Sequence, residues 1–326
     1  MIEFVSLLAI YIGIYAILSM GLNLVVGYTG LLSLCHAAFL AVGAYTTAIL
    51  MVALHTSFWW ALLLSGAFAA LAGLLIGLPT LRLTGDYLAI ATLGFGEIIK
   101  NIIINWDSLT RGPMGIPNVP MIRLFSVTID PFKKWEYMIL VGAFVVVTYV
   151  ILRRITRSRL GRALEAIRED EIAASSMGIN TFKYKSLSFT VGSFFAGIAG
   201  SLWAAYNQSV SPGTFDFNLS VLILCMVVLG GLGNHWGAIL GAAIIMLASE
   251  FPRLVGITDI ISPQVRQMLF GAILVAMMIF RPSGLLTRRK PAFGRYLDAA
   301  RGGDPAAGRG SGSLGGPWPG PPEAQR

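Results

Sequence analysis

Residues whose side chains could do chemistry are few in this chain. Its three histidines, His36, His55 and His235, lie far apart from one another, so we expect no metal site. Both cysteines, Cys35 and Cys225, lie alone in apolar stretches, where a buried thiol without a reaction is the simplest interpretation. We find neither a Ser-His-Asp arrangement nor a pair of catalytic carboxylates. The sequence therefore predicts no catalytic residue and no metal ligand.

The densest group of charges lies in a polar stretch over residues 158–180. Apolar side chains such as Leu164 and Ile167 recur there every three or four positions, which indicates an amphipathic helix, and Gly178 fits its end. Such a helix could lie on lipid headgroups or dock a cytoplasmic protein. Anionic headgroups would repel its acidic residues, so we favour docking. These acidic residues are Glu165, Glu169, Asp170 and Glu171.

Two pairs of glycines have the same GxxG spacing. The first pair is Gly27 and Gly30, and the second is Gly230 and Gly233. Each pair follows a Val-rich apolar run, which could be a weak trace of two related halves. Glycines in apolar runs serve either close packing of membrane helices or broken helices that line a path. The candidates for a translocation path are both glycine pairs and the nearby polar residues Asn23, Ser33 and His36.

Two opposite charges interrupt an apolar run. Glu97 and Lys100 are three residues apart, on one face of an expected helix. Ionisable residues inside a membrane are a functional hypothesis by default, but two charges that neutralise each other explain the pattern equally well. Near the start of the same run, we expect Asp86 to cap the helix N-terminus.

The elements that position these residues are membrane helices. Hydrophobic residues make up 56% of the 326 residues and charged residues only 12%, against about 25% in soluble domains. The apolar runs are continuous, whereas outer-membrane strands alternate. We predict an all-α polytopic integral membrane protein with about eight to ten spans, some of them broken. The runs are 4–26, 31–54, 58–78, 87–106, 137–152, 186–206, 219–229, 236–248 and 265–280, with a mixed segment over 107–135.

The basic residues predict how the chain crosses the membrane. Of 24 Lys and Arg, eight lie between Arg153 and Lys185, and eight more lie from Arg281 onward. Two basic clusters beside apolar runs are typical of cytoplasmic loops rather than of a nucleic-acid-binding surface. Both clusters fall on the same side when the intervening runs cross, so we expect a cytoplasmic C-terminus. Counting backwards puts the N-terminus outside only if every short run crosses, so the sequence leaves its side open. The first run lacks a basic leader and is interpreted as a span, not a signal peptide.

The last part of the chain differs in composition. Fifteen of the 36 residues over 291–326 are Gly or Pro, which leaves little apolar surface to repay the cost of ordering. We expect a transmembrane permease domain over residues 1–290, followed by a disordered cytoplasmic tail without a catalytic role.

Several stretches resemble the permease subunits of branched-chain amino-acid ABC importers of the LivM type. The segment 170–178, with Ala173, Ala174 and Gly178, resembles the "EAA" loop of ABC-importer permeases, and the wider run 168–180 matches the LivM type. Two departures are visible, because Cys35 and Arg111 stand where glycine is common in the family. The other matching stretches, in the same order along the chain, are 27–39, 85–93, 110–116, 194–200 and 280–286.

The resemblance implies a bundle similar to the type II importer fold in the inner membrane. It implies a second related permease, two cytoplasmic ABC ATPases and a periplasmic or lipid-anchored substrate-binding protein as partners, besides membrane lipid. ATP and Mg would bind the ATPases, since this chain has neither a GxxxxGK[ST] loop nor an LSGGQ-like signature and needs no cofactor. The residues implied in ATPase coupling are Glu165, Arg168, Glu169, Asp170, Glu171, Ala173, Ala174 and Gly178.

The function expected from this resemblance is import of branched-chain or other hydrophobic amino acids by alternating access. The same machinery could instead carry urea or short amides. A stand-alone ion-coupled transporter is the main alternative of another class, but Glu97 is its sole candidate carboxylate and the 158–180 segment would have no role. A membrane enzyme would need a cluster of polar catalytic residues, and the sequence offers none.

Overall fold

The computed structural model describes residues 2–80, 83, 85–124, 127–129, 134–254, 271, 285 and 286. The chain divides into two units, residues 1–287 and 288–326, and all described residues belong to the first. The expected tail over 291–326 lies outside the described residues, as does nearly all of the apolar run 265–280.

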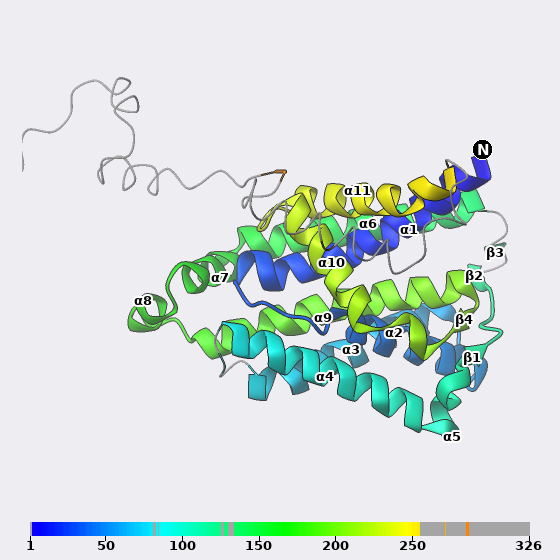
Figure 1. The fold of residues 1–326 in the computed structure, drawn as a ribbon, viewed down its shortest axis with the longest axis horizontal. Helices are drawn as coiled ribbons and strands as arrows, with labels where there is room; N and C mark the ends of the chain where they lie inside the picture. Colours follow the sequence, from blue (N-terminus) through cyan, green and yellow to red (C-terminus); the bar gives the residue numbers. More distant parts are fainter. Residues whose placement is uncertain are drawn as a thin grey trace, which may run out of the picture. The chain divides into compact units, whose positions relative to one another are not determined.

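Helices make up most of the first unit, as predicted (Figure 1). The long helices are α1 (Ile2–Asn23), α2 (His36–Val52), α3 (Phe58–Thr80), α4 (Asp86–Asn105), α6 (Lys134–Arg157), α7 (Arg159–Glu169), α9 (Thr181–Asn207), α10 (Phe217–Gly230) and α11 (His235–Leu254). The short elements are η1 (Leu24–Tyr28), α5 (Asp107–Thr110), η2 (Gly112–Met114), β1 (Ile116–Pro117), β2 (Ile122–Leu124), β3 (Val127–Ile129), α8 (Glu171–Ser176), β4 (Ser209–Val210) and η3 (Pro212–Thr214).

The apolar helices account for the predicted polytopic architecture. Six described segments are long and apolar enough to cross a membrane, and α2 and α11 are two shorter apolar helices. The prediction of one continuous run over 31–54 was wrong, because residues 31–35 have no regular structure and α2 begins only at His36. The backbone N–H of Leu34 instead donates to Thr92 Oγ1 of α4 at 3.1 Å, so a side chain replaces the missing helical bond.

Helix α9 packs most extensively against α3 and α2 and also contacts α1. Small residues permit this close approach: a Cβ added at Gly43 of α2 would lie 2.3 Å from the carbonyl oxygen of Gly197 in α9. A Cβ at Gly200 would similarly meet the carbonyl oxygen of Leu40 at 2.2 Å. Close packing is therefore the role of these glycines.

Within this unit, α7 and α8 lie at one end of the bundle, and α5 lies with the four strands at the other (Figure 1). The strands form two antiparallel pairs, in which Ile116 faces Val210 and Ile122 faces Ile129. Neither the mixed segment 107–135, which contains β1, β2 and β3, nor the β4 segment carries a sequence signal for these pairings, since each strand has only two or three residues.

Two local predictions need correction. The single helix expected over 158–180 is two helices, because Asp170 leaves the helical conformation (φ −156°, ψ 110°) and its side chain caps α8. The prediction that Asp86 caps α4 was also wrong. Gly85 occupies the N-cap position at φ 57°, and Asp86 is the first helical residue. There its negative charge interacts favourably with the positive end of the helix dipole.

Candidate functional site

The first glycine pair lies where α1 ends in the π-helical turn η1. The side-chain oxygen of Asn23 accepts a hydrogen bond of 2.9 Å from the backbone N–H of Gly233. A Cβ added at Gly27 would lie 2.0 Å from that oxygen and 2.4 Å from the Gly233 nitrogen. Only glycine fits at position 27 without displacing this bond. π-turns inside helices are frequent at functional sites.

The second glycine pair lies between α10 and α11. Gly231 and Gly233 adopt φ values of 116° and 80°, which reverse the chain between the two helices. The ring of Tyr28 then stacks on that of His235, with centroids 5.1 Å apart. The two glycine pairs, far apart in sequence, thus meet in space. We call the group of Asn23, Gly27, Tyr28, Gly233 and His235 the glycine junction. Gly230, the remaining candidate here, packs against Gly237 of α11.

Arg168 of α7 reaches into this junction. Its Nη1 donates a hydrogen bond to the carbonyl oxygen of Gly27. Gly30, at φ 75°, lies against the same side chain, since an added Cβ would be 3.1 Å from Arg168 Cγ. The apolar face predicted for this helix is confirmed, because Leu164 and Ile167 are buried. Helix α7 is therefore attached to the bundle and to the end of α1.

Helix α8 is held by its charged residues. Asp170 accepts backbone hydrogen bonds from Ile172 at 2.9 Å and Ala173 at 3.0 Å. Glu171 forms an ion pair of 2.5 Å with Lys185, whose side chain is only 4% exposed. The helix ends at Gly178, at φ 81°, the conformation expected for a glycine stop. Asp170 and Glu171 therefore stabilise α8 through contacts within this chain.

The outer face of this segment is exposed to solvent. Ala174 is buried, but Ala173, Glu169 and Gly178 are exposed, and Glu165 is half-buried. Sequence reasoning missed two large apolar side chains here, Ile172 and Met177, which are 80% and 83% exposed. The sequence signal that could have identified them is their position away from the apolar stripe of Leu164 and Ile167. An exposed apolar pair on a capped helix fits a docking surface better than an isolated loop.

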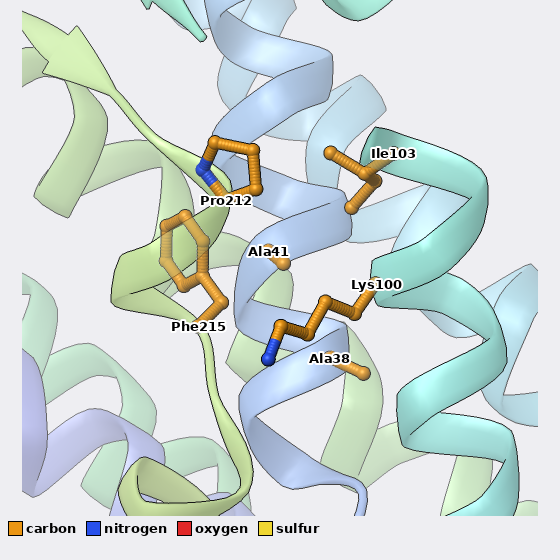
Figure 2. A pocket seen from close by; sticks show the side chains of 6 residues that line it. All are labelled: Ala38, Ala41, Lys100, Ile103, Pro212 and Phe215. Carbon is orange, nitrogen blue, oxygen red and sulfur yellow. The ribbon is translucent and has the colours of Figure 1, made fainter. Parts of the chain in front are cut away.

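A second polar region lies between α2, α4 and α10, near the η3 segment. Two adjoining shallow hollows share Ala38 and Phe215 as lining residues, and in this structure they have space for no more than about one water molecule. Figure 2 shows the side chain of Lys100 lying across the face of α2 formed by Ala38 and Ala41, with its nitrogen toward the segment of Phe215. Glu97 lines the adjoining hollow. We call both together the α4 hollow.

The charges of the α4 hollow are half-buried and unpaired. Within the described residues, neither Lys100 Nζ nor the Glu97 carboxylate forms an ion pair or a hydrogen bond. The interpretation that the two neutralise each other therefore lacks the contact it requires. A third charge, Asp216, is occupied, because it caps α10 through Leu219 at 3.0 Å and accepts from Asn218 at 2.7 Å.

Two further path candidates lie inside the bundle. Ser33 and His36 are each 1% exposed, and neither lines the α4 hollow. The hydroxyl of Ser33 lies 3.4 Å from Cys35 Sγ, and the ring of His36 meets Phe39 edge-on at 5.9 Å. In the described part of the chain, no three His, Cys, Asp or Glu residues gather as metal ligands would.

Comparison with known proteins gives one family. Residues 4–278 match the family described as the permease component of branched-chain amino acid transport systems. The chain is 40% identical over 310 residues to the high-affinity branched-chain amino acid transport system permease protein LivM of Escherichia coli strain K12, covering 89% of this chain and 71% of that protein. No solved structure matches this chain.

Two more distant relatives carry similar descriptions. The chain is 27% identical over 288 residues to the branched-chain amino acid permease BraD of Pseudomonas aeruginosa, covering 84% of this chain and 92% of that protein. It is 25% identical over 293 residues to LivH of Salmonella typhimurium strain LT2, covering 84% and 91%. The chain is thus similar both to LivM and, more weakly, to LivH, two permease proteins described for the same transport system.

Proposed function

Because this chain belongs to the family of branched-chain amino acid transport permeases, we propose that it is one membrane-spanning half of an ATP-driven importer of branched-chain or other hydrophobic amino acids. The family membership confirms the resemblance inferred from the motifs between residues 27 and 286. The chain is a multi-pass membrane permease component, as the six long apolar helices among the described residues also indicate. The proposal adds the energy source, the partners and the mechanism of alternating access.

The observation that carries the mechanism is the hydrogen bond from Arg168 to Gly27. It links α7, at the end of the bundle, to the point where α1 stops being a regular helix. We infer that an ATPase docks on the 158–180 segment and moves α7, and that this movement reaches the glycine junction through Arg168. Movement is coupled to ATP only if docking has a different free energy in the inward-facing and outward-facing states.

The partners follow from this arrangement. A second permease related to LivH completes the path, since the LivM and LivH relatives are described for the same system. Two cytoplasmic ABC ATPases bind ATP and Mg, and a periplasmic or lipid-anchored binding protein delivers the cargo. We infer that the 158–180 segment and the C-terminus lie on the cytoplasmic side of the inner membrane, and the basic residues in both regions support this orientation.

The test is a matched pair of substitutions at exposed methionines. Met177 is 83% exposed on the 158–180 segment, and Met114 is 91% exposed at the other end of the bundle. We expect Met177→Asp to prevent co-purification of the ATPases and ATP-driven leucine uptake, because a buried unpaired charge disrupts an apolar interface. Met114→Asp should leave ATPase co-purification unchanged. Gly178→Leu should act like Met177→Asp, since leucine is strained at this φ.

The outcomes separate the alternatives. Normal uptake by Met177→Asp and Gly178→Leu would remove the docking role. Leucine uptake by the isolated chain in vesicles without ATP would instead support an ion-coupled transporter. Uptake of urea in preference to leucine by the assembled wild-type complex would support the short-amide alternative.

A further inference from the structure

We propose that the α4 hollow is a transient binding subsite for the amino-acid cargo, in which Lys100 binds the carboxylate, Glu97 binds the ammonium group and Ala38, Ala41 and Phe215 contact the aliphatic side chain. This inference rests on the proposed function and assigns its cargo to named residues. It follows from three features of the hollow: the depth of its charges, their spacing and the nature of its walls.

The charges lie well inside a span. Helix α4 covers Asp86–Asn105, and Glu97 and Lys100 are eight and five residues from its end at Asn105. At about 1.5 Å per residue, this places them roughly 12 and 7 Å from that end. Charged side chains at such depth cost several kcal/mol in an apolar surrounding unless something binds them. Since no described residue pairs with either group, a bound charged molecule is the simplest compensation.

Their spacing matches a zwitterion. Side chains three residues apart on a helix lie side by side, with Cβ atoms about 5–6 Å apart. An α-amino acid carries its ammonium and carboxylate on the same carbon, so one molecule can satisfy both charges at once. Lys100 extends across α2 toward the segment of Phe215 (Figure 2), and it forms no ion pair with Glu97. A neutral amide would leave both charges unpaired.

The walls suit a short aliphatic side chain. The α2 face consists of alanines, of which Ala38 lines both hollows, and Phe215 and Ile103 add larger apolar surfaces. Ser220 of α10 supplies one more polar group. Its hydroxyl accepts from the Ala37 N–H at 3.1 Å, so its proton remains available to a carboxylate.

The hollow also lies where two membrane elements begin within the bundle. Helix α2 starts at His36 after an irregular stretch, and α10 starts at Phe217 after the η3 segment. Transporter sites are typically built at such interrupted helices. The hollow is shallow and in this structure has space for about one water molecule, so the cargo binds only when α4 moves away from α2 and α10. Contact in such a transient opening is weak, as a permease needs because the cargo must also leave.

Transport by the full reconstituted complex tests the charges. We expect Lys100→Met and Glu97→Gln each to lower ATP-driven leucine uptake by about tenfold or more, the loss of one charged hydrogen bond. Co-purification of the ATPases should stay unchanged, and so should the stimulation of their ATP hydrolysis by leucine-loaded binding protein. Lys100→Arg and Glu97→Asp should keep most of the uptake, and the double variant should be at least as slow as either single variant.

The results that overturn the proposal are distinct from a failure of the proposed function. Wild-type uptake by both single variants would remove the subsite. Recovery of leucine uptake in the double variant would show that the two charges only neutralise each other or the same partner. If the wild-type complex itself does not import leucine with ATP, the proposed function fails instead.

Chemical labelling tests binding directly. Both native cysteines are buried, so an added cysteine can be followed with a maleimide. Leu93 is half-buried and lines the hollow, whereas Ile98 is 51% exposed on the same helix and does not line it. In the assembled complex, a high leucine concentration should slow labelling of Leu93→Cys but not of Ile98→Cys. Adding Lys100→Met should abolish that protection. Labelling of Leu93→Cys that leucine does not change would overturn the subsite.

Discussion

The glycine junction and the α4 hollow both lie where a membrane helix is interrupted, but they differ in how their polar groups are used. At the junction, the oxygen of Asn23 bonds to Gly233, and Arg168 bonds to Gly27. In the hollow, Lys100 and Glu97 have no partner among the described residues. The junction is also filled, whereas the hollow is a shallow depression open on one side.

This difference indicates two tasks. Groups that bond to each other across the junction can transmit a displacement, because moving one strains the other. Groups that face open space cannot transmit force, but they can bind a molecule that arrives and leaves. The same kind of substitution made in both regions tests this difference.

The largest effect is expected from adding one methyl group to each region. A Cβ at Gly27 would lie 2.0 Å from Asn23 Oδ1, whereas a Cβ at Gly96, which lines the hollow, would meet Cys35 Cα at an ordinary 3.5 Å. Gly27→Ala should cost about 2–6 kcal/mol of stability, the sum of an overpacked contact and a lost buried hydrogen bond. Gly96→Ala should be close to neutral. Thermal unfolding of the purified complex in detergent measures both.

The pair of variants has a clear contrary result. Equal unfolding temperatures for Gly27→Ala and Gly96→Ala would mean that the junction is no tighter than the hollow. In Gly27→Ala, leucine uptake should fall along with stability. In Gly96→Ala, stability should not change, and uptake should fall only because the added methyl group narrows the hollow.

A smaller effect is expected from removing one negative charge in the 158–180 segment, which Arg168 links to the junction, and one in the hollow. Glu171 pairs with Lys185, which is 4% exposed, whereas Glu97 has no such pair. Glu171→Gln leaves a buried ammonium without its partner and should cost about 1–3 kcal/mol. Glu97→Gln should leave stability unchanged or raise it while uptake falls. Lys185→Met should be milder than Glu171→Gln, because the remaining carboxylate is 39% exposed to solvent.

Stability and uptake together decide the comparison. If Glu97→Gln destabilised the complex as much as Glu171→Gln, Glu97 would be a structural partner of another subunit and not a group that binds cargo.

Much of the fold could be predicted from the sequence, because long apolar runs allow few structures in a membrane. The polar break at Asp170 could not be found by hydrophobic period, since the apolar pattern continues across it to Ala174. The irregular residues 31–35 were missed for a related reason: they are mostly apolar, and a bond to Thr92 of a distant helix stabilises them.

The candidate site was predicted in part. The GxxG spacing identified both glycine pairs, and Asn23 was named for its polarity inside an apolar run. That the two pairs touch, with Arg168 attached to one of them, is a property of the tertiary structure alone. Lys100 and Glu97 were recognised as charges in a span, but the alanine face of α2 that gives them a hollow lies some 60 residues away in sequence.

The smallest effect tests whether the junction is connected to the 158–180 segment. Arg168→Met removes the hydrogen bond to Gly27, whereas Arg162→Met removes another exposed arginine of the same helix. We expect Arg168→Met to raise the ATP hydrolysed per imported leucine by roughly five- to tenfold, equivalent to about 1–1.4 kcal/mol, with assembly retained. Arg162→Met should keep the wild-type ratio. If Arg168→Met also kept it, movement of α7 would have to reach the bundle through its buried apolar face, and the junction would be a packing contact without a part in coupling.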